Sequence, residues 1–171
     1  LDACAAHGGK ACHLLERHPG ITLVALDSSA PRVERVRQNL QRLQLEATLA
    51  CGDAAAPHAW WDGQPFDRIL VDAPCSGTGV IRRHPDIRIL RTAAQIKEAA
   101  ALQLAILRGL WQCLRPGGTL LYSTCSVLPQ EKTLGIDCGI ARSHGRQLLP
   151  TVSEHDGFFY ARLRKTSSST H

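Results

Sequence analysis

Apolar segments that are typical of strands alternate with amphipathic segments that are typical of helices, and this alternation constrains the fold more than any other feature. The predicted strands are the apolar runs 1–4, 21–26, 47–51, 68–71 and 119–123. Between them the pattern predicts a short helix carrying Leu14, a helix with Val33, Val36 and Leu40 at helical spacing, and a long helix over 96–114. Such alternation predicts an α/β domain built on a mainly parallel sheet.

The carboxyl-terminal part of the chain is less regular. A last strand is predicted over 157–164, whereas Gly135, Gly139 and Gly145 disfavour a helix in the segment 132–146. A chain of 171 residues suits one domain, which we place at 1–165, followed by a polar tail at 166–171 that we expect to be disordered. Because the sequence lacks methionine and opens inside a predicted strand, we expect an N-terminally truncated piece of a longer protein.

Composition narrows the classes of protein to consider. The net charge of +5 and the pI near 9.0 favour a polyanionic partner. No apolar run is long enough to span a membrane and no leader is evident, so we expect a cytoplasmic protein. The seven cysteines form no C-x-x-C pair, which argues against a metal site or a disulfide framework. Four of them are predicted to be buried core residues: Cys12, Cys51, Cys113 and Cys138.

Three predicted strand ends carry residues suited to a nucleotide-like ligand. They are the turn at residues 4–10, Asp27 after the second strand and Asp53 after the third. In an open parallel sheet, ligands bind beyond the carboxyl ends of the strands. Asp27 is placed to accept hydrogen bonds from the hydroxyls of an adenosine ribose, and Asp53 to accept one from the adenine amino group. Each acid alone could instead cap a strand end, and a dinucleotide site is the competing interpretation, although the turn lacks G-x-G-x-x-G.

Two further strand ends carry cysteines, in the segments Asp-Ala-Pro-Cys-Ser-Gly at 72–77 and Ser-Thr-Cys-Ser at 123–126. Carbon 5 of cytosine is a weak nucleophile, and it becomes electron-rich when a thiolate adds at carbon 6. That reaction also needs a group that holds N3 and the exocyclic amine, which Asp72 could provide. From the residues alone, both Cys75 and Cys125 remain candidates for the nucleophile.

Four stretches resemble the RsmB (Sun/Fmu) branch of the RNA 5-methylcytosine methyltransferases. They are LDACAAHGGK at 1–10, DAPCSGTGVIRRHPD at 72–86, STCSVLPQE at 123–131 and DGFFYARL at 156–163. The resemblance implies a class I S-adenosylmethionine-dependent (Rossmann-like) fold with an antiparallel C-terminal strand and methyl transfer to cytosine C5 of small-subunit (16S) ribosomal RNA. It makes Cys125 the nucleophile, Cys75 the residue that assists release, and Asp72 a third site residue. The S-adenosylmethionine site would comprise Cys4, Ala5, Ala6, His7, Gly8, Gly9, Lys10, Asp27, Asp53 and Asp72.

The sequence departs from the family pattern at two places. His7 stands where the family has proline, so the fixed φ of proline is missing from the cofactor turn. The segment 132–146 is shorter than the helix and loop usual in the family. These departures leave open a non-catalytic RNA-binding remnant, and the two cysteines leave open a thiol-based redox protein.

Arginines after the first cysteine segment are the predicted RNA contacts. Arg82, Arg83, Arg88 and Arg91 lie close together in the sequence, and phosphate binding is the role we expect for them. A solvated helix face is the alternative. The target base must leave its stack to reach a cysteine, so the expected substrate is an unstacked cytosine, bound by a monomeric protein.

Overall fold

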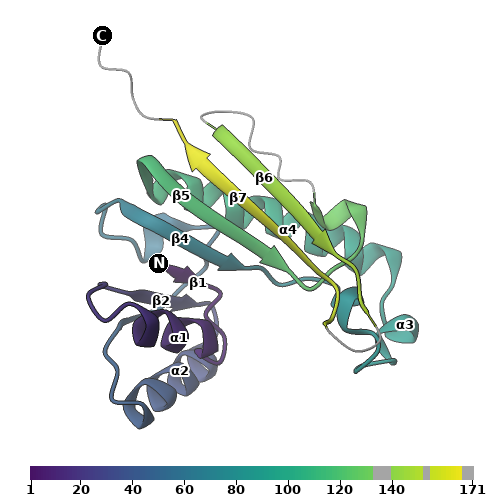
Figure 1. Ribbon diagram of the computed structural model, residues 1–171, viewed down its shortest axis with the longest axis horizontal. Coiled ribbons are helices and arrows are strands. Elements are labelled where there is room, and N and C mark those ends of the chain that lie inside the picture. The colour runs from purple at the N-terminus through teal and green to yellow at the C-terminus, as the bar shows by residue number, and fades with distance from the viewer. Residues whose placement is uncertain (133–139, 152–154, 167–171) are drawn as a thin grey trace.

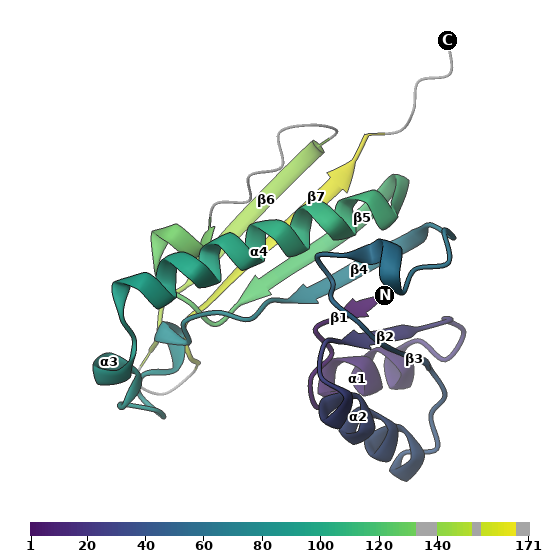
Figure 2. The same ribbon diagram turned by 180° about the vertical axis from the view of Figure 1, so that it is seen from behind.

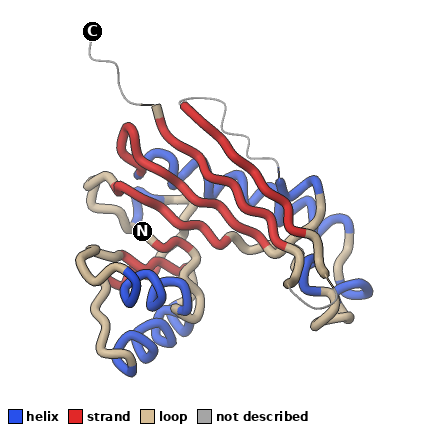
Figure 3. Tube along the Cα trace, in the orientation of Figure 1, coloured by secondary structure: helices blue, strands red, loops and turns tan. Residues whose placement is uncertain are grey.

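Seven strands form one mixed sheet that carries the rest of the molecule. The computed structural model describes residues 1–132, 140–151 and 155–166 (Figure 1). The strands are β1 (Asp2–Ala3), β2 (Val24–Asp27), β3 (Thr48–Cys51), β4 (Phe66–Asp72), β5 (Leu114–Thr124), β6 (Ile140–Leu148) and β7 (Phe158–Lys165). Their order is β3-β2-β1-β4-β5-β7-β6. The first five run parallel, whereas β7 is antiparallel to both β5 and β6. Figure 3 shows the strands side by side in one sheet.

Helices cover both faces of this sheet. They are α1 (Gly9–Arg17), α2 (Ala30–Arg42), α3 (Ile87–Leu90) and α4 (Ala93–Cys113), with 3-10 turns η1 (Pro57–Ala59), η2 (Thr78–Val80) and η3 (Pro129–Lys132). Successive strand residues point to opposite faces. Ala25 packs with buried residues of α1 and α2, whereas Leu26 belongs to the larger core with α4. Figures 1 and 2 show the same division, with α4 along the face seen in Figure 2.

The longest described helix, α4, begins at a signal that the sequence analysis missed. The Thr92 hydroxyl accepts a bond from Gln95 N at 3.3 Å, and the Gln95 side chain accepts one from Thr92 N at 3.1 Å. This capping box satisfies donors at the helix start and places it at Ala93 rather than at Ile96. Within the described part of the chain, no helix combines the length and the apolar character needed to cross a membrane.

The strand order reverses direction next to β1. The chain runs outward from β1 to β2 and β3, then returns to β4 on the other side of β1. A crevice at the carboxyl ends of the strands is the usual ligand site at such a switch point. The fold therefore brings the turn after β1 beside the loops that follow β4 and β5.

Several sequence predictions need correction. Strand β6 was not predicted, because 140–148 mixes glycine and charged residues with its apolar ones. Cys51 is exposed rather than buried, because β3 is an edge strand of the sheet, while Cys12 and Cys113 are buried as predicted. Residues 115–118, predicted as a turn, form a bulge within β5 opposite Asp67. Cys138 and residues 167–171 of the predicted tail lie outside the described residues.

Gly109 allows α4 to pack closely on the segment after β3, and its substitution tests that packing. A Cβ at this position would lie 2.7 Å from Ala54 O and 2.9 Å from Ala55 O, both of them backbone atoms. Overpacking costs about 1–3 kcal/mol, whereas replacing a helical glycine by alanine returns about 1 kcal/mol at most. We expect Gly109→Ala to lower the free energy of unfolding, measured by urea denaturation. Gly20→Ala, where a Cβ meets nothing within 4 Å, serves as the control; equal stability of the two variants would contradict the packing.

Candidate active site

The predicted site residues line one edge of the sheet. Asp27 ends β2 and Asp72 ends β4, while the turn at 4–10 follows β1 between them. Asp53 comes two residues after β3, and Cys125 directly follows β5. The spatial order of these groups along the edge therefore follows the strand order, with the acids on one side and the cysteines on the other.

The turn after β1 has a tightly coiled backbone. Cys4, Ala6 and Gly8 have φ values of 62°, 46° and 86°, all in the left-handed region. Such values are unusual for residues other than glycine. Hydrogen bonds hold the turn in place, with Ala5 N donating to Leu26 O and Gly8 N to Ala5 O, both at 2.9 Å. A Cβ at Gly9 would meet nothing within 4 Å, so open space lies beside the first residue of α1.

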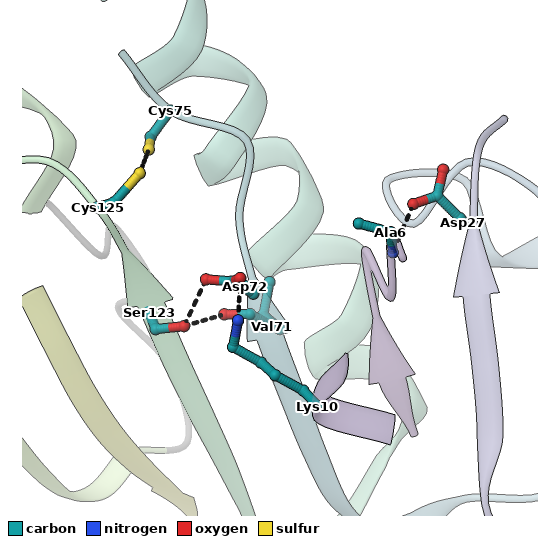
Figure 4. Close-up of polar contacts among 8 residues, drawn as sticks. All are labelled: Ala6, Lys10, Asp27, Val71, Asp72, Cys75, Ser123 and Cys125. Atoms are coloured by element: carbon teal, nitrogen blue, oxygen red, sulfur yellow. Dashed lines mark hydrogen bonds and ion pairs between the residues drawn. The ribbon is translucent and has the colours of Figure 1, made fainter. Parts of the chain in front are cut away.

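Asp27 anchors this turn from the neighbouring strand. Its side chain is 2% exposed. Oδ2 accepts a bond from Ala6 N at 3.0 Å (Figure 4), while Oδ1 accepts one from Ser29 N at 2.9 Å and pairs with Arg32 at 3.0 Å. The carboxylate thus already has a structural role, as the alternative interpretation of a lone acid expected. Each carboxylate oxygen accepts more than one bond, so Oδ2 retains capacity for a ligand hydroxyl.

His7, the departure from the family pattern, is held by α2. Its carbonyl oxygen accepts a bond from the Asn39 side chain at 2.8 Å, and its Nε2 lies 3.2 Å from a guanidinium nitrogen of Arg35. The ring is exposed. The backbone path of the turn is therefore fixed by hydrogen bonds from a neighbouring helix, without the ring of a proline.

Asp53 lies in the next loop along the edge. Its Oδ1 accepts a bond from Ala55 N at 2.8 Å, and the side chain is exposed. Gly52 N donates to Asp27 O at 3.0 Å, which holds the ends of β2 and β3 together. The structure thus brings the two predicted adenosine contacts to neighbouring positions.

Asp72 connects the turn at residues 4–10 to the loops that carry Cys75 and Cys125. Lys10 forms an ion pair with Asp72 Oδ2, and the Ser123 hydroxyl donates to Asp72 Oδ1 at 2.9 Å (Figure 4). Lys10 comes from the start of α1 and Ser123 from β5, so Asp72 lies between the two halves of the site.

The two cysteines meet side by side. Their side chains point toward each other in Figure 4, and their sulfur atoms are 3.2 Å apart. Both thiols are free and half-buried. The hydrogen bond from Cys75 lowers the pKa of Cys125 below its usual range, although burial and the charge of Asp72 oppose that shift. The same bond, together with burial, raises the pKa of Cys75. Of the two thiols, Cys125 is therefore the one that ionises more readily.

Backbone bonds connect the loops around the thiols. Gly79 N donates to Cys125 O at 2.8 Å, and Gly157 N donates to Gly79 O at 2.9 Å. A Cβ at Gly79 would lie 2.0 Å from Gly157 O, so only glycine fits at this crossing. Three of the four family-like stretches, 72–86, 123–131 and 156–163, thus meet at one place.

The predicted RNA-binding arginines take mixed roles. Arg82 donates to Thr151 O at 2.6 Å, Arg83 pairs with Asp156, and Arg91 donates to Ser76 O at 2.9 Å. Arg88 lies exposed on α3 and has no side-chain bond to a described residue. Three of the four guanidinium groups therefore hold loops together, a function that sequence reasoning did not foresee.

Sequence reasoning also missed a buried carboxylate beneath the thiols. Glu131 is 1% exposed and accepts bonds from the loops of both cysteines. It is the last residue of the 123–131 stretch, but nothing in the sequence assigned it a role. In the described part of the chain, no group of three or more His, Cys, Asp or Glu side chains could hold a metal ion.

The fold and the site define the class of protein. The chain forms a class I S-adenosylmethionine-dependent methyltransferase domain. Its features are a Rossmann-like sheet with antiparallel C-terminal strands, a glycine turn after β1, and acids at the ends of β2 and β4 and after β3. The chain belongs to the 16S rRNA methyltransferase RsmB/F family, whose sequence profile matches residues 1–145. This confirms the fold class, the resemblance and the cofactor class of the family.

Similar proteins support this assignment. Ribosomal RNA small subunit methyltransferase B of Shewanella oneidensis is 53% identical over 98% of this chain and 43% of its own length. The protein of that name from Pseudomonas putida is 51% identical, over 99% and 43%. The chain thus spans less than half the length of these relatives.

Solved structures agree. NSun6 from Pyrococcus horikoshii, determined with SFG, superposes with a TM-score of 0.86 and 29% identity over 98% of this chain and 47% of that one. A methyltransferase homolog protein from Pyrococcus horikoshii gives a TM-score of 0.77 and 30% identity, covering 96% of this chain and 60% of that one.

The hydrogen bond between the thiols can be tested through the pKa of Cys125. Cys75→Ala removes the donor that favours the Cys125 thiolate, so the pKa of Cys125 should rise. We expect iodoacetamide to alkylate Cys125 at half its maximal rate only at a higher pH than in the unaltered chain, as followed by peptide mass spectrometry. Cys75→Ser keeps a donor and should shift the profile less, while the exposed Cys51 provides an internal control. An unchanged profile in Cys75→Ala would show that the bond does not set the pKa.

Proposed function

We propose that the protein containing this chain transfers a methyl group from S-adenosylmethionine to carbon 5 of a cytosine in small-subunit ribosomal RNA, through a covalent bond between Cys125 and carbon 6. The observation that carries the proposal is the 3.2 Å thiol pair beside Asp72, at the carboxyl ends of neighbouring strands. A cysteine that only fills the core would have no reason to lie at a strand end beside a second thiol. A nucleophile and a neighbouring group that transfers a proton must lie together in this way.

The residues at the other half of the site suit the methyl donor. Open space beside Gly9 and the coiled turn at 4–10 let backbone atoms approach a ligand, and Asp27, Asp53 and Asp72 offer acceptors at three successive strand ends. These residues would hold S-adenosylmethionine, as its adenosine hydroxyls and amines need such acceptors. When bound, this group supplies an electrophilic methyl.

Cys125, Asp72 and Cys75 have separate roles in the proposed reaction. The Cys125 thiolate adds to carbon 6, which pushes electrons toward carbon 5. Asp72, as a carboxylate paired with Lys10, accepts a bond from the exocyclic amine and so orients the ring. Once carbon 5 carries the methyl group, Cys75 takes the proton from carbon 5, the sulfur–carbon 6 bond breaks, and its electrons return to Cys125. The cysteine is thereby regenerated.

We propose RNA contacts for the arginines that follow the loop of Cys75. Arg88 is the arginine best placed to contact a phosphate, because Arg82, Arg83 and Arg91 support the loops. The substrate would present its cytosine unstacked, since the thiols are half-buried. We propose a cytoplasmic, monomeric protein acting on this RNA, with further contacts supplied by parts of the whole protein beyond this chain.

Replacing Cys125 and replacing Cys75 should have opposite effects on the covalent bond between protein and RNA. In the whole protein, Cys125→Ser should abolish transfer of labelled methyl groups to ribosomal RNA, because no thiolate remains at carbon 6. Cys75→Ser should accumulate a protein–RNA adduct that survives denaturing electrophoresis, because elimination is blocked. Methyl transfer that persists without Cys125 would reject the covalent mechanism.

The cofactor half is tested separately by calorimetry. S-adenosylmethionine should bind to the whole protein, and Asp27→Ala should weaken binding by about tenfold or more, since a charge-assisted hydrogen bond contributes roughly 1.5–3 kcal/mol. Asp62→Ala, at an exposed turn, is the control. Absence of binding in the unaltered protein would favour the non-catalytic remnant.

A further inference from the structure

Glu131 is a buried carboxylate that pairs with no basic side chain among the described residues. It lies in η3 and is 1% exposed. Burying a charge in this way is costly unless hydrogen bonds compensate it. The origin of those bonds therefore indicates what the carboxylate does.

Four donors surround the carboxylate, and they divide between its two oxygens. Oε1 accepts bonds from Ser76 N at 2.8 Å and from Gln103 Nε2 at 2.9 Å. Oε2 accepts bonds from the hydroxyls of Ser76 and Ser126, each at 2.5 Å. Charge-assisted bonds of this kind are shorter and stronger than neutral ones.

Three of the four donors come from the two loops that carry the thiols. Ser76 directly follows Cys75, and Ser126 directly follows Cys125. The loops are 50 residues apart in sequence, and one carboxylate holds the residue after each cysteine. Removing it would leave Ser76 N without its acceptor in a buried place, and the two serine hydroxyls with only each other and Thr78 as longer partners, at 3.2–3.4 Å.

The fourth donor, Gln103, fixes the carboxylate to the core. Gln103 in α4 also donates to Pro74 O at 2.9 Å and accepts a bond from the Tyr122 hydroxyl at 3.0 Å. That hydroxyl reaches Glu131 O as well, at 3.3 Å. Helix α4 and strand β5 thus orient the carboxylate from below, and the loops rest on it.

We propose that Glu131 is a positioning residue that clamps the two cysteine loops together and so sets the distance between the Cys75 and Cys125 thiols. The inference rests on the proposed function for its catalytic meaning, but the clamp itself is a property of the folded chain. Glu131 contacts neither thiol through any described bond, and it acts through Ser76 and Ser126.

The clamp carries an electrostatic cost. The negative charge of Glu131 raises the pKa of Cys75 and opposes the lowering of the pKa of Cys125. A residue kept for charge alone would therefore work against the nucleophile. Position and charge can be separated because a neutral residue of the same shape exists.

Glutamine can reproduce the clamp without the charge. In Glu131→Gln, the amide oxygen can accept from Ser76 N and Gln103, while the amide nitrogen faces two serine hydroxyls that can turn to accept. Glu131→Ala removes every acceptor. The pair of variants distinguishes a clamp, which glutamine keeps, from a charge, which it loses.

The distance between the thiols can be measured without RNA or cofactor. Diamide, a diazene, takes up two hydrogen atoms as two adjacent thiols form a disulfide, and peptide mass spectrometry quantifies the Cys75–Cys125 product. We expect the unaltered chain and the exposed control Glu98→Ala to form it at similar rates, and Glu131→Gln to form it at least as fast, because loss of the charge favours the thiolates. Glu131→Ala should form it about tenfold more slowly or worse, since small displacements of reacting groups cost that much.

The outcomes separate the alternatives. A folded Glu131→Ala that forms the disulfide at the unaltered rate overturns the clamp, and a Glu131→Gln as slow as Glu131→Ala shows that charge matters instead. If Glu131→Ala does not fold, Ser126→Ala removes one clamped donor and should give a smaller slowing, whereas no slowing again overturns the proposal.

Methyl transfer by the whole protein gives the catalytic readout. Glu131→Ala should lower kcat with KM for RNA little changed, and Glu131→Gln should retain activity with a pH profile displaced to lower pH. An unaltered protein that lacks methyl transfer, with the disulfide rates as expected, would reject the proposed function and leave the clamp standing.

Discussion

The parallel pairing of β4 with β5 is the constraint on which the site depends. Asp72 lies opposite Ser123 in this register, and the Ser123 hydroxyl bonds to the Asp72 carboxylate at 2.9 Å. A slip of one residue would turn every side chain of the strand to the other face of the sheet. Cys75 is three residues beyond one strand position and Cys125 two beyond the other, so their meeting is a consequence of that register. The core on the α4 face, with Val71 and Tyr122 buried, fixes it.

Local patterns in the sequence were enough to predict the parallel strands and the main helices. Continuous apolar runs located the strands and period-3.6 spacing located the helices, while acids and cysteines at the strand ends marked the side of the sheet where they meet. Features that depend on neighbours in space were missed. Cys51 looks buried in an apolar run, but its strand is at the edge of the sheet. The partners of Glu131 are separated from it by up to 55 residues, and no local rule connects them.

The cofactor turn shows why a motif residue can change while the fold persists. Proline would restrict φ at position 7 chiefly by limiting the unfolded chain. In the folded chain, the carbonyl of His7 is held by Asn39, and the preceding turn amide, that of Ala6, by Asp27. The turn therefore has native-state restraints of its own, and the substitution acts on the free energy of unfolding more than on the backbone path.

Coupling between the thiols gives the proposed reaction an order. Two thiols whose sulfur atoms lie 3.2 Å apart titrate as a pair, and the first proton to leave makes the second harder to remove. The charge of the Cys125 thiolate is one cause of the raised pKa of Cys75. When Cys125 bonds to carbon 6, its sulfur becomes a neutral thioether, and that cause disappears. The pKa of Cys75 would then fall, although burial and the charge of Glu131 still raise it, so the proposed base becomes easier to ionise at the stage when elimination needs one.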